Sequence, residues 1–280
     1  AVGVRGLLRD PDTKKVIAQV EVKADKVVLA AGAVNTPVLL LRQRLANSSG
    51  LVGHNLHIQP GSAIIAEFEE EIHIWKGATQ GYFAYHPHEP EILAESFSST
   101  PETFFAAVGE PGEAAHMLLR RLKHLGGAGS MIRDESSGVI EPSSSGPPQI
   151  SYSLTERDRQ KLTTGTEFVA DMFFNAGARF VFPLLGGSEW FEERNTCKRF
   201  IREVENPADF MLYASHPMGT CQVGADSAKS VVRVADGRTH DHEGLYVMDA
   251  SLMPTALGVN PQVTIMAQCL ALSRRIAALG

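Results

Sequence analysis

The chain has 280 residues, which is enough to bury a sizeable core in one large domain or two smaller ones. Its hydrophobic fraction of 44% and charged fraction of 21% are ordinary for a globular protein, and its net charge of −6 argues against a nucleic-acid partner. The three cysteines lack the spacing of a zinc site or a disulfide framework, and no apolar stretch of membrane-spanning length runs uninterrupted by charge or glycine.

The N-terminal part of the chain is expected to form strands followed by a helix. A turn signal at residues 10–13 separates apolar runs, and residues 20–23 alternate as a half-buried antiparallel strand does. Residues 27–31 are continuously apolar, which is typical of a buried parallel strand. The sequence Asn-Thr-Pro that begins at Asn35 then opens a short apolar helix over residues 38–45.

The middle of the chain is expected to form an antiparallel sheet with helices laid against it. Strands are predicted at residues 64–68, 72–75, 81–85, 131–134, 138–140, 149–154 and 177–183. One helix is predicted over residues 101–125, ended by the glycine-rich run 126–129, and another from Thr155 past Phe174. The first of these is interpreted as a core helix, with a membrane-surface helix or a lid over an apolar channel as alternatives.

Histidines in this part of the chain do not indicate a metal site. His54 and His57 are three residues apart, but no third ligand stands nearby. His73, His86 and His88 are best explained as polar positions on or beside strands. No metal is therefore expected.

Three segments in the last quarter of the chain carry distinctive motifs. The first places His216 in the run Ser-His-Pro-Met-Gly-Thr-Cys, and the second is a strand-like run over residues 244–250 that includes Asp249. The third, Gly-Val-Asn-Pro-Gln, opens a long apolar helix in which Asn260 is suited to the cap and Pro261 to the first helical position. This helix is expected to be buried, because its apolar residues lie all round it, and to carry amide donors and positive potential at its start.

These segments carry a resemblance to a known family. The order His-Pro-Met-Gly-Thr-Cys, Gly-Leu-Tyr-Val-Met-Asp-Ala-Ser and Gly-Val-Asn-Pro-Gln-Val-Thr-Ile-Met-Ala resembles the C-terminal signature of the glucose–methanol–choline (GMC) oxidoreductases, which are FAD-dependent alcohol oxidases and dehydrogenases. The similarity extends to residues 27–36 and 53–57. The start Gly-x-Asn-Leu-His, an Arg-Asp-x-x-x-Gly strand pair and the long helix after Tyr-x-Leu most resemble the long-chain fatty alcohol oxidase branch.

The resemblance implies an α/β fold of two domains. Residues 1–55 and 222–280 would form part of an FAD-binding Rossmann-type domain, and residues 56–221 an α+β substrate domain whose antiparallel sheet walls the pocket over the flavin. The Gly-x-Gly-x-x-Gly loop that cradles a dinucleotide pyrophosphate is not found after any strand, and the sequence opens inside a strand-like run. The chain is therefore expected to be a fragment that needs a missing N-terminal portion of the same protein.

The resemblance also implies roles for particular residues. His216 matches the catalytic histidine, whose near-neutral pKa suits removal of the hydroxyl proton. Asn260 matches the position that hydrogen-bonds the substrate oxygen, and because a neutral amide cannot act as a base, the proton must go to His216. The residues expected to bind FAD are Ala31, Gly32, Asn35, Asp249, Ala250, Asn260, Pro261 and Gln262.

The expected function is oxidation of the CH–OH group of a long-chain or otherwise apolar alcohol by hydride transfer to FAD. Oxygen or another acceptor would then take the electrons. The alternatives are a polyol, sugar-acid or sterol dehydrogenase of the same family, and a non-catalytic remnant that binds a partner chain or an apolar ligand. A cytoplasmic or peripheral membrane location is expected.

Overall fold

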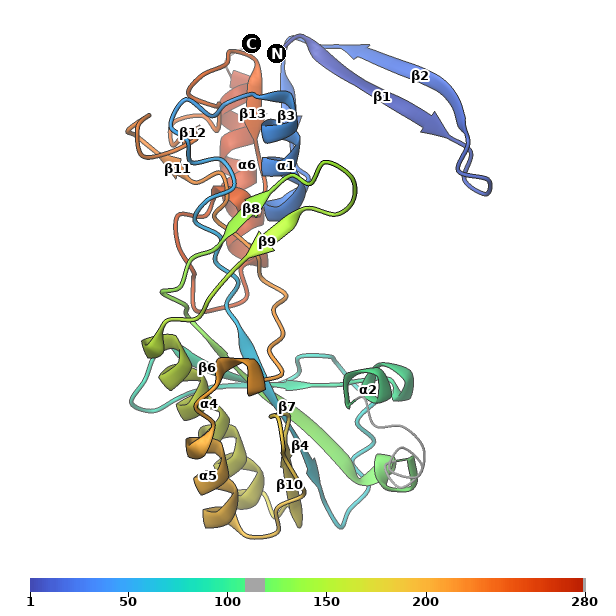
Figure 1. Cartoon of the computed structure of the whole chain (residues 1–280), viewed down its shortest axis with the longest axis vertical. Helices are drawn as coiled ribbons and strands as arrows, with labels where there is room; N and C mark the ends of the chain where they lie inside the picture. The colour runs from blue at the N-terminus through green and yellow to red at the C-terminus, as the bar shows by residue number, and fades with distance from the viewer. Residues whose placement is uncertain (109–118, 279–280) are drawn as a thin grey trace.

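The computed structural model describes residues 1–108 and 119–278, and it arranges them in two lobes with a projecting hairpin (Figure 1). The lower lobe holds a five-stranded sheet and two helices packed side by side. The upper lobe holds both ends of the chain and a pair of parallel strands between helices. The predicted mixed α/β class with an antiparallel sheet is confirmed, whereas the domain boundaries near residues 56 and 222 stay a prediction.

The lower lobe is built on an antiparallel sheet with strand order β10–β4–β7–β6–β5. The strands are β4 (Gly61–Glu67), β5 (Phe83–Tyr85), β6 (Ile92–Phe97), β7 (Leu125–Ile132) and β10 (Phe180–Pro183). Successive side chains alternate between the two faces of a strand, so each strand serves both. On the helix face, Ile64 and Ile92 pack under α4 (Glu156–Asn175) and α5 (Arg194–Glu203). On the opposite face, called the pocket face below, Ile65 packs with residues that include Phe104 of α2 (Pro101–Val108).

Helix α4 starts where the sequence predicts and lies unusually close to the sheet. Its N-cap is Thr155, whose hydroxyl accepts a hydrogen bond from the Asp158 amide at 3.2 Å. Close packing is possible because Gly165 has no side chain, since a Cβ there would lie 2.6 Å from Oγ of Ser130 in β7. The contact fixes the helix face of the sheet in place.

The upper lobe is organised around the parallel pair β3 (Val27–Leu29) and β13 (Leu245–Val247). Their apolar residues form one buried cluster with α1 (Gly32–Gln43) and α6 (Gln262–Ala278). The smaller elements of this lobe are β8 (Val139–Glu141), β9 (Gln149–Ser151), β11 (Val223–Gly224), β12 (Val232–Arg233) and the short 3-10 turn η3 (Ala250–Leu252). Strands β1 (Gly3–Arg9) and β2 (Val16–Lys23) form the projecting hairpin, and the 3-10 turns η1 (Leu122–His124) and η2 (Pro207–Asp209) belong to the lower lobe. The predicted parallel strand is confirmed over Val27–Leu29, but it is shorter than predicted and not buried throughout, since Val28 is 46% exposed.

Helix α1 begins six residues earlier than predicted, at Gly32, and contains Pro37. A proline inside a helix cannot donate to the carbonyl four residues before it, which here belongs to Ala33. The hydroxyl of Thr220 donates to that carbonyl instead, at 2.6 Å. A residue distant in sequence therefore compensates for the proline, and local sequence could not reveal it.

Two predicted strand features and one predicted helix end are wrong. Residues 72–75 form a loop and turn, in which the Ile72 and His73 amides both donate to the carbonyl of Lys123. Strand β2 is exposed along its whole length rather than half-buried. The glycine-rich run 126–129 lies inside β7 rather than ending a helix, because the Phe97 ring packs where a side chain at Gly127 would lie. Part of the helix predicted over residues 101–125 lies outside the described residues.

Helix α6 is also less buried than predicted. Leu272 and Ile276 are buried against the upper lobe, but Val263 is 73% exposed and Met266 and Leu270 are more than half exposed. In the described residues the helix packs along one side only, so the apolar residues on its other sides face outward.

Candidate active site

A cavity of about 830 Å³ lies between the pocket face of the sheet and the start of α6. Most of its wall is apolar, with Ile65, Phe97 and Leu184 on the side of the sheet and Ile265 on the side of the helix. Polar side chains gather where the segment containing His216 meets the loop before α6. These include Glu95, Tyr213, His216 and Asn260, and the polar residues Gln80, Ser98, Ser99 and Thr103 also line the cavity.

His216 is half-buried at this polar end, and backbone pairing holds the segment that carries it. The amide of Met218 donates to the carbonyl of His57 at 2.8 Å, and the amide of His57 donates back at 3.0 Å. Burial lowers the pKa of His216 below its ordinary value of 6.5, because a charged imidazolium is poorly solvated there. The imidazole is therefore neutral at pH 7, as a proton acceptor must be.

Asn260 contacts both His216 and Glu95 through the same atom. Its Nδ2 lies 3.4 Å from Nε2 of His216 and 3.4 Å from Oε2 of Glu95. Because a carboxylate only accepts hydrogen bonds, the amide must turn its NH₂ group toward Glu95, and the same group then donates to His216. This assignment leaves Nε2 of His216 unprotonated and places the ring proton on Nδ1.

The predicted helix cap at Asn260 is wrong in detail. Helix α6 begins at Gln262, and the first bond of its ladder runs from the Ile265 amide to the Pro261 carbonyl at 2.9 Å. Pro261 therefore precedes the helix rather than occupying its first position. The side chain of Asn260 instead turns to the cavity, where it meets His216.

Sequence reasoning missed Glu95 and Tyr213. The alternation of β6 places Glu95 between two apolar residues of the pocket face, and this polar residue in an apolar row was an available signal. Tyr213 lies over Gly61 and Gly129, where a Cβ on Gly129 would lie 2.4 Å from the phenol oxygen. Burial and the nearby charge of Glu95 raise the pKa of Tyr213 to about 12, so the phenol stays protonated.

A second group of predicted residues meets at the carboxyl ends of β3 and β13. Asp249 is buried, and its Oδ2 accepts from the Gly32 amide at 2.9 Å and from the Thr36 hydroxyl at 2.5 Å. Its Oδ1 accepts from the amide and the hydroxyl of Ser251. The Asp249 side chain thus ties the two strand ends to α1. Ala250, the first residue of η3, is partly exposed beside it.

The geometry at these strand ends fits a dinucleotide. Ligands of parallel α/β sheets lie at the carboxyl ends of the strands. Ala31 and Asn35 are exposed there, and Gly32 has φ +81° with open space where a side chain would lie. The other predicted group, Asn260, Pro261 and Gln262, lies at the start of α6, whose first-turn amides are free of helical partners as in any helix.

In the described part of the chain, no group of three or more His, Cys, Asp or Glu side chains is arranged so that it could hold a metal ion. His54 and His57 do not act as a pair: His57 is buried, with Nδ1 3.5 Å from Oδ2 of Asp134. Among the described helices, none is both long and apolar enough to cross a membrane.

Comparison with known proteins identifies the family. Two models described as GMC oxidoreductase match residues 1–61 and 117–268, and the second match covers more than half of the chain. The chain belongs to the GMC oxidoreductase family. This family uses FAD, and the resemblance that the sequence motifs indicated is confirmed.

Three similar proteins illustrate the range of the match. An uncharacterized GMC-type oxidoreductase of Mycobacterium tuberculosis is 32% identical over 99% of this chain and 43% of its own length. The long-chain-alcohol oxidase FAO1 of Arabidopsis thaliana is 28% identical over 99% of this chain and 38% of its own length. A solved FAD-dependent oxidoreductase of Chaetomium thermophilum shares the fold with a TM-score of 0.64 at 17% identity, covering 99% of this chain and 58% of that one. The chain spans less than half the length of these two curated relatives.

Proposed function

We propose that this chain contributes the proton acceptor and the substrate pocket of an FAD-dependent oxidase of long-chain or otherwise apolar alcohols. The observation that carries the proposal is the contact between Nε2 of His216 and Nδ2 of Asn260 in a cavity whose wall is mostly apolar. A pocket of this kind suits a substrate with one hydroxyl and a long apolar tail.

Each residue of the pair has a distinct task. The substrate hydroxyl replaces the NH₂ group of Asn260 as the donor to Nε2 of His216, and this unprotonated nitrogen then takes the hydroxyl proton as the carbonyl of the product forms. The NH₂ group of Asn260 donates to the substrate oxygen and stabilises the negative charge that develops on it. FAD supplies the acceptor for the hydride of the carbinol carbon when it is bound.

Two groups of residues would hold FAD. Ala31, Gly32 and Asn35, with Asp249 and Ala250, lie at the strand ends, where an open backbone lets the cofactor approach. Asn260, Pro261 and Gln262 lead into α6, whose first amides and positive end suit the electron-rich edge of the flavin ring. Close packing of the ring beside His216 would also exclude water from the hydroxyl.

The substrate class is proposed from the cavity and from the relatives. Several side chains of the wall are aliphatic or aromatic, and the Arabidopsis relative FAO1 is named as a long-chain-alcohol oxidase. By the same comparison, oxygen is the proposed electron acceptor. A polyol or sugar acid would place some of its hydroxyls against Ile65, Phe97 and Leu184, which offer them no hydrogen-bond partners.

Anaerobic mixing of the FAD-loaded protein with alcohols tests this function. 1-Dodecanol should bleach the flavin absorbance and yield dodecanal, whereas glucose and gluconate should not. Admission of oxygen should restore the absorbance. If 1-dodecanol leaves the flavin oxidised while a polyol reduces it, the proposed substrate class is wrong.

A further inference from the structure

The segment that links the lobes contains two residues in an uncommon backbone conformation. Asn55 has φ +62° and Gln59 has φ +49°, in the left-handed region that non-glycine residues seldom adopt. Such conformations persist where the surrounding structure enforces them, and they gather at functional sites. Both side chains are amides, and both reach the same loop.

That loop runs from Pro254 to Asn260 and presents Asn260 to the cavity. Gln59 is 1% exposed, and its side-chain amide makes two hydrogen bonds to the backbone of two consecutive residues. Oε1 accepts from the Gly258 amide, and Nε2 donates to the Val259 carbonyl at 3.0 Å. Nδ2 of Asn55 donates to the Pro254 carbonyl at 3.2 Å. The last bonded residue, Val259, directly precedes Asn260.

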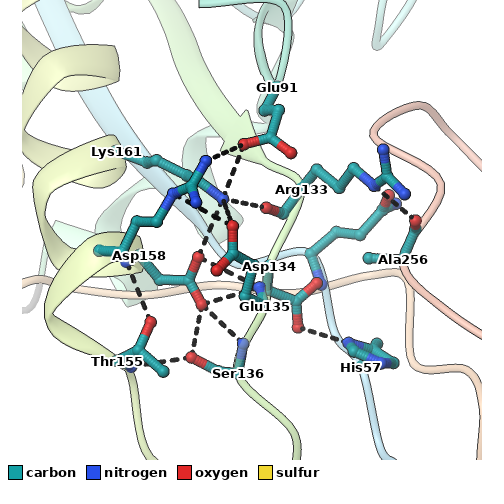
Figure 2. A network of polar contacts seen from close by, with 12 residues as sticks. His57, Glu91, Arg133, Asp134, Glu135, Ser136, Thr155, Asp158, Lys161 and Ala256 are labelled. Carbon is teal, nitrogen blue, oxygen red and sulfur yellow. Dashed lines mark hydrogen bonds and ion pairs between the residues drawn. The ribbon is translucent and has the colours of Figure 1, made fainter.

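A buried carboxylate holds the strained turn beneath Gln59. Asp134 accepts from the amides of Ile58 and Gln59 at 3.1 and 3.2 Å, and from the Tyr152 hydroxyl at 2.8 Å. The preceding residue, Arg133, reaches the same loop directly and donates from Nε to the Ala256 carbonyl at 3.1 Å (Figure 2). Figure 2 also shows Lys161 of α4 bonded to the Arg133 carbonyl, at 3.0 Å, so the support extends to the helix face of the lower lobe.

The same short segment also holds His216. Within it, His57 exchanges two backbone hydrogen bonds with Met218, two residues after His216. The backbone of His57 therefore fixes one member of the reactive pair, while the side chain of Gln59 fixes the loop that presents the other. The 3.4 Å contact between Nε2 of His216 and Nδ2 of Asn260 thus joins two segments that are both attached to residues 55–59.

We infer that Gln59 is a positioning residue that sets the place of Asn260 relative to His216. This inference rests on the proposed function, because it assumes that Asn260 acts on the substrate. The oxygen and the nitrogen of the buried Gln59 amide each bond to the backbone of the loop, at Gly258 and Val259. Two bonds from one side chain prevent the loop from sliding along the segment or rotating about a single bond.

A double-mutant cycle in the FAD-loaded holoenzyme tests the link. Gln59→Leu keeps most of the volume of the side chain but removes both bonds. It should slow anaerobic flavin reduction by 1-dodecanol several-fold, up to the about fivefold loss expected for Asn260→Ala, because a displaced Asn260 loses its hydrogen bond to the substrate oxygen. In an Asn260→Ala background the same change should have no further effect, because its target is gone. Equal slowing in both backgrounds would overturn the inference. If Asn260→Ala alone does not slow reduction, the proposed function fails instead.

Hydrogen exchange gives a readout that needs no turnover. In Gln59→Leu the peptide covering residues 254–261 should exchange faster, while β4 keeps its protection. Gln160→Leu makes the same change at an exposed position of α4, and it should leave the exchange rates of residues 254–261 and of β4 unchanged. Unchanged protection of the loop in Gln59→Leu would contradict the inference.

Gln59→Gly covers the case in which the leucine variant does not fold. Glycine adopts φ +49° without strain, so this variant loses the amide but relaxes the backbone. It should slow reduction and loosen the loop as Gln59→Leu does. Wild-type rate and protection in Gln59→Gly would show that the amide does not position Asn260.

Discussion

The two faces of the five-stranded sheet are made by the same strands but differ in how their polar groups are satisfied. On the helix face, the buried hydroxyls of Ser62, Ser130 and Thr166 bond to one another at 2.6–3.0 Å, and Thr166 also donates to the Leu162 carbonyl. On the pocket face, Glu95 and the nearby His216 meet only through the 3.4 Å contacts of Asn260. On the helix face, the buried hydroxyls bond to other groups of the chain. On the pocket face, Glu95, His216 and Asn260 can still form hydrogen bonds to a ligand.

The largest effect is expected from the supports of the helix face. The carboxylate of Asp158 is buried, accepts from the amides of Glu135 and Ser136 at 2.9 and 2.7 Å and from the Ser136 hydroxyl at 2.5 Å, and contacts Lys161 at 3.3 Å. Asp158→Ala should lower the free energy of unfolding by about 3 kcal/mol, since it strips several buried groups of their partner. Urea unfolding followed by circular dichroism measures this loss.

Glu156 provides the matched control for that experiment. It lies two residues earlier on the same helix and pairs with Arg159 at 2.6 Å, but it is exposed. Because exposed ion pairs add little, Glu156→Ala should change the unfolding midpoint only slightly. Equal losses from both variants would remove the contrast between the buried and exposed carboxylates of α4.

The next largest effect is expected at the pocket face and in rate rather than stability. His216→Ala should slow anaerobic flavin reduction by roughly a hundredfold or more, the usual scale for loss of a general base. The flavin spectrum and the unfolding midpoint should stay close to those of the wild type. Stopped-flow reduction at an unchanged rate would remove His216 from the mechanism.

Asn260→Ala should have a smaller effect on the same measurement. Loss of one hydrogen bond to the substrate oxygen is worth about 1 kcal/mol, or about fivefold in rate. Since Asn260 is exposed and α6 begins two residues later, no cap is lost and stability should hardly change. A fall in stability without a fall in rate would assign Asn260 to the structure rather than to the chemistry.

The sequence predicted what depends on local chemistry. The start of α4 follows from the side chain of Thr155, and the family resemblance carried by two short motifs singled out His216 and Asn260, which the structure brings into contact. What it could not predict depends on contacts between distant segments. The glycines of β7 suggest a break until the rings of Phe97 and Tyr213 are seen to pack where their side chains would lie.

The candidate site shows the same division. Glu95 reaches Asn260 across 165 residues of chain, and Gln59 reaches Gly258 across 199. In both cases the residues next to Glu95 or Gln59 in the sequence do not indicate which distant residue it will contact. The alternation of β6 could have marked Glu95 as a polar residue on an apolar face, but the buried role of Gln59 depends on a left-handed turn that its sequence does not demand.

The smallest expected effect is a dependence on pH, and it arises at His216 beside the pocket face. The folded-state pKa of His216 lies below 6.5 because of burial, so the neutral base persists to lower pH than for a free histidine. Flavin reduction should therefore be constant above about pH 6.5 and fall as pH drops through the lowered pKa. Stability should depend on pH for the same reason. At a pH between the folded-state pKa and 6.5, His216 is protonated in the unfolded chain but neutral in the folded chain, so the free energy of unfolding should fall as pH drops from 6.5 toward the folded pKa.

The difference in unfolding free energy between wild type and His216→Ala, measured at pH 7 and again at pH 5, isolates this contribution from that of the carboxylates. A wild type that loses no more stability than His216→Ala over that range would show that burial does not disfavour the charged imidazole, and the pocket would then be wetter than its geometry indicates.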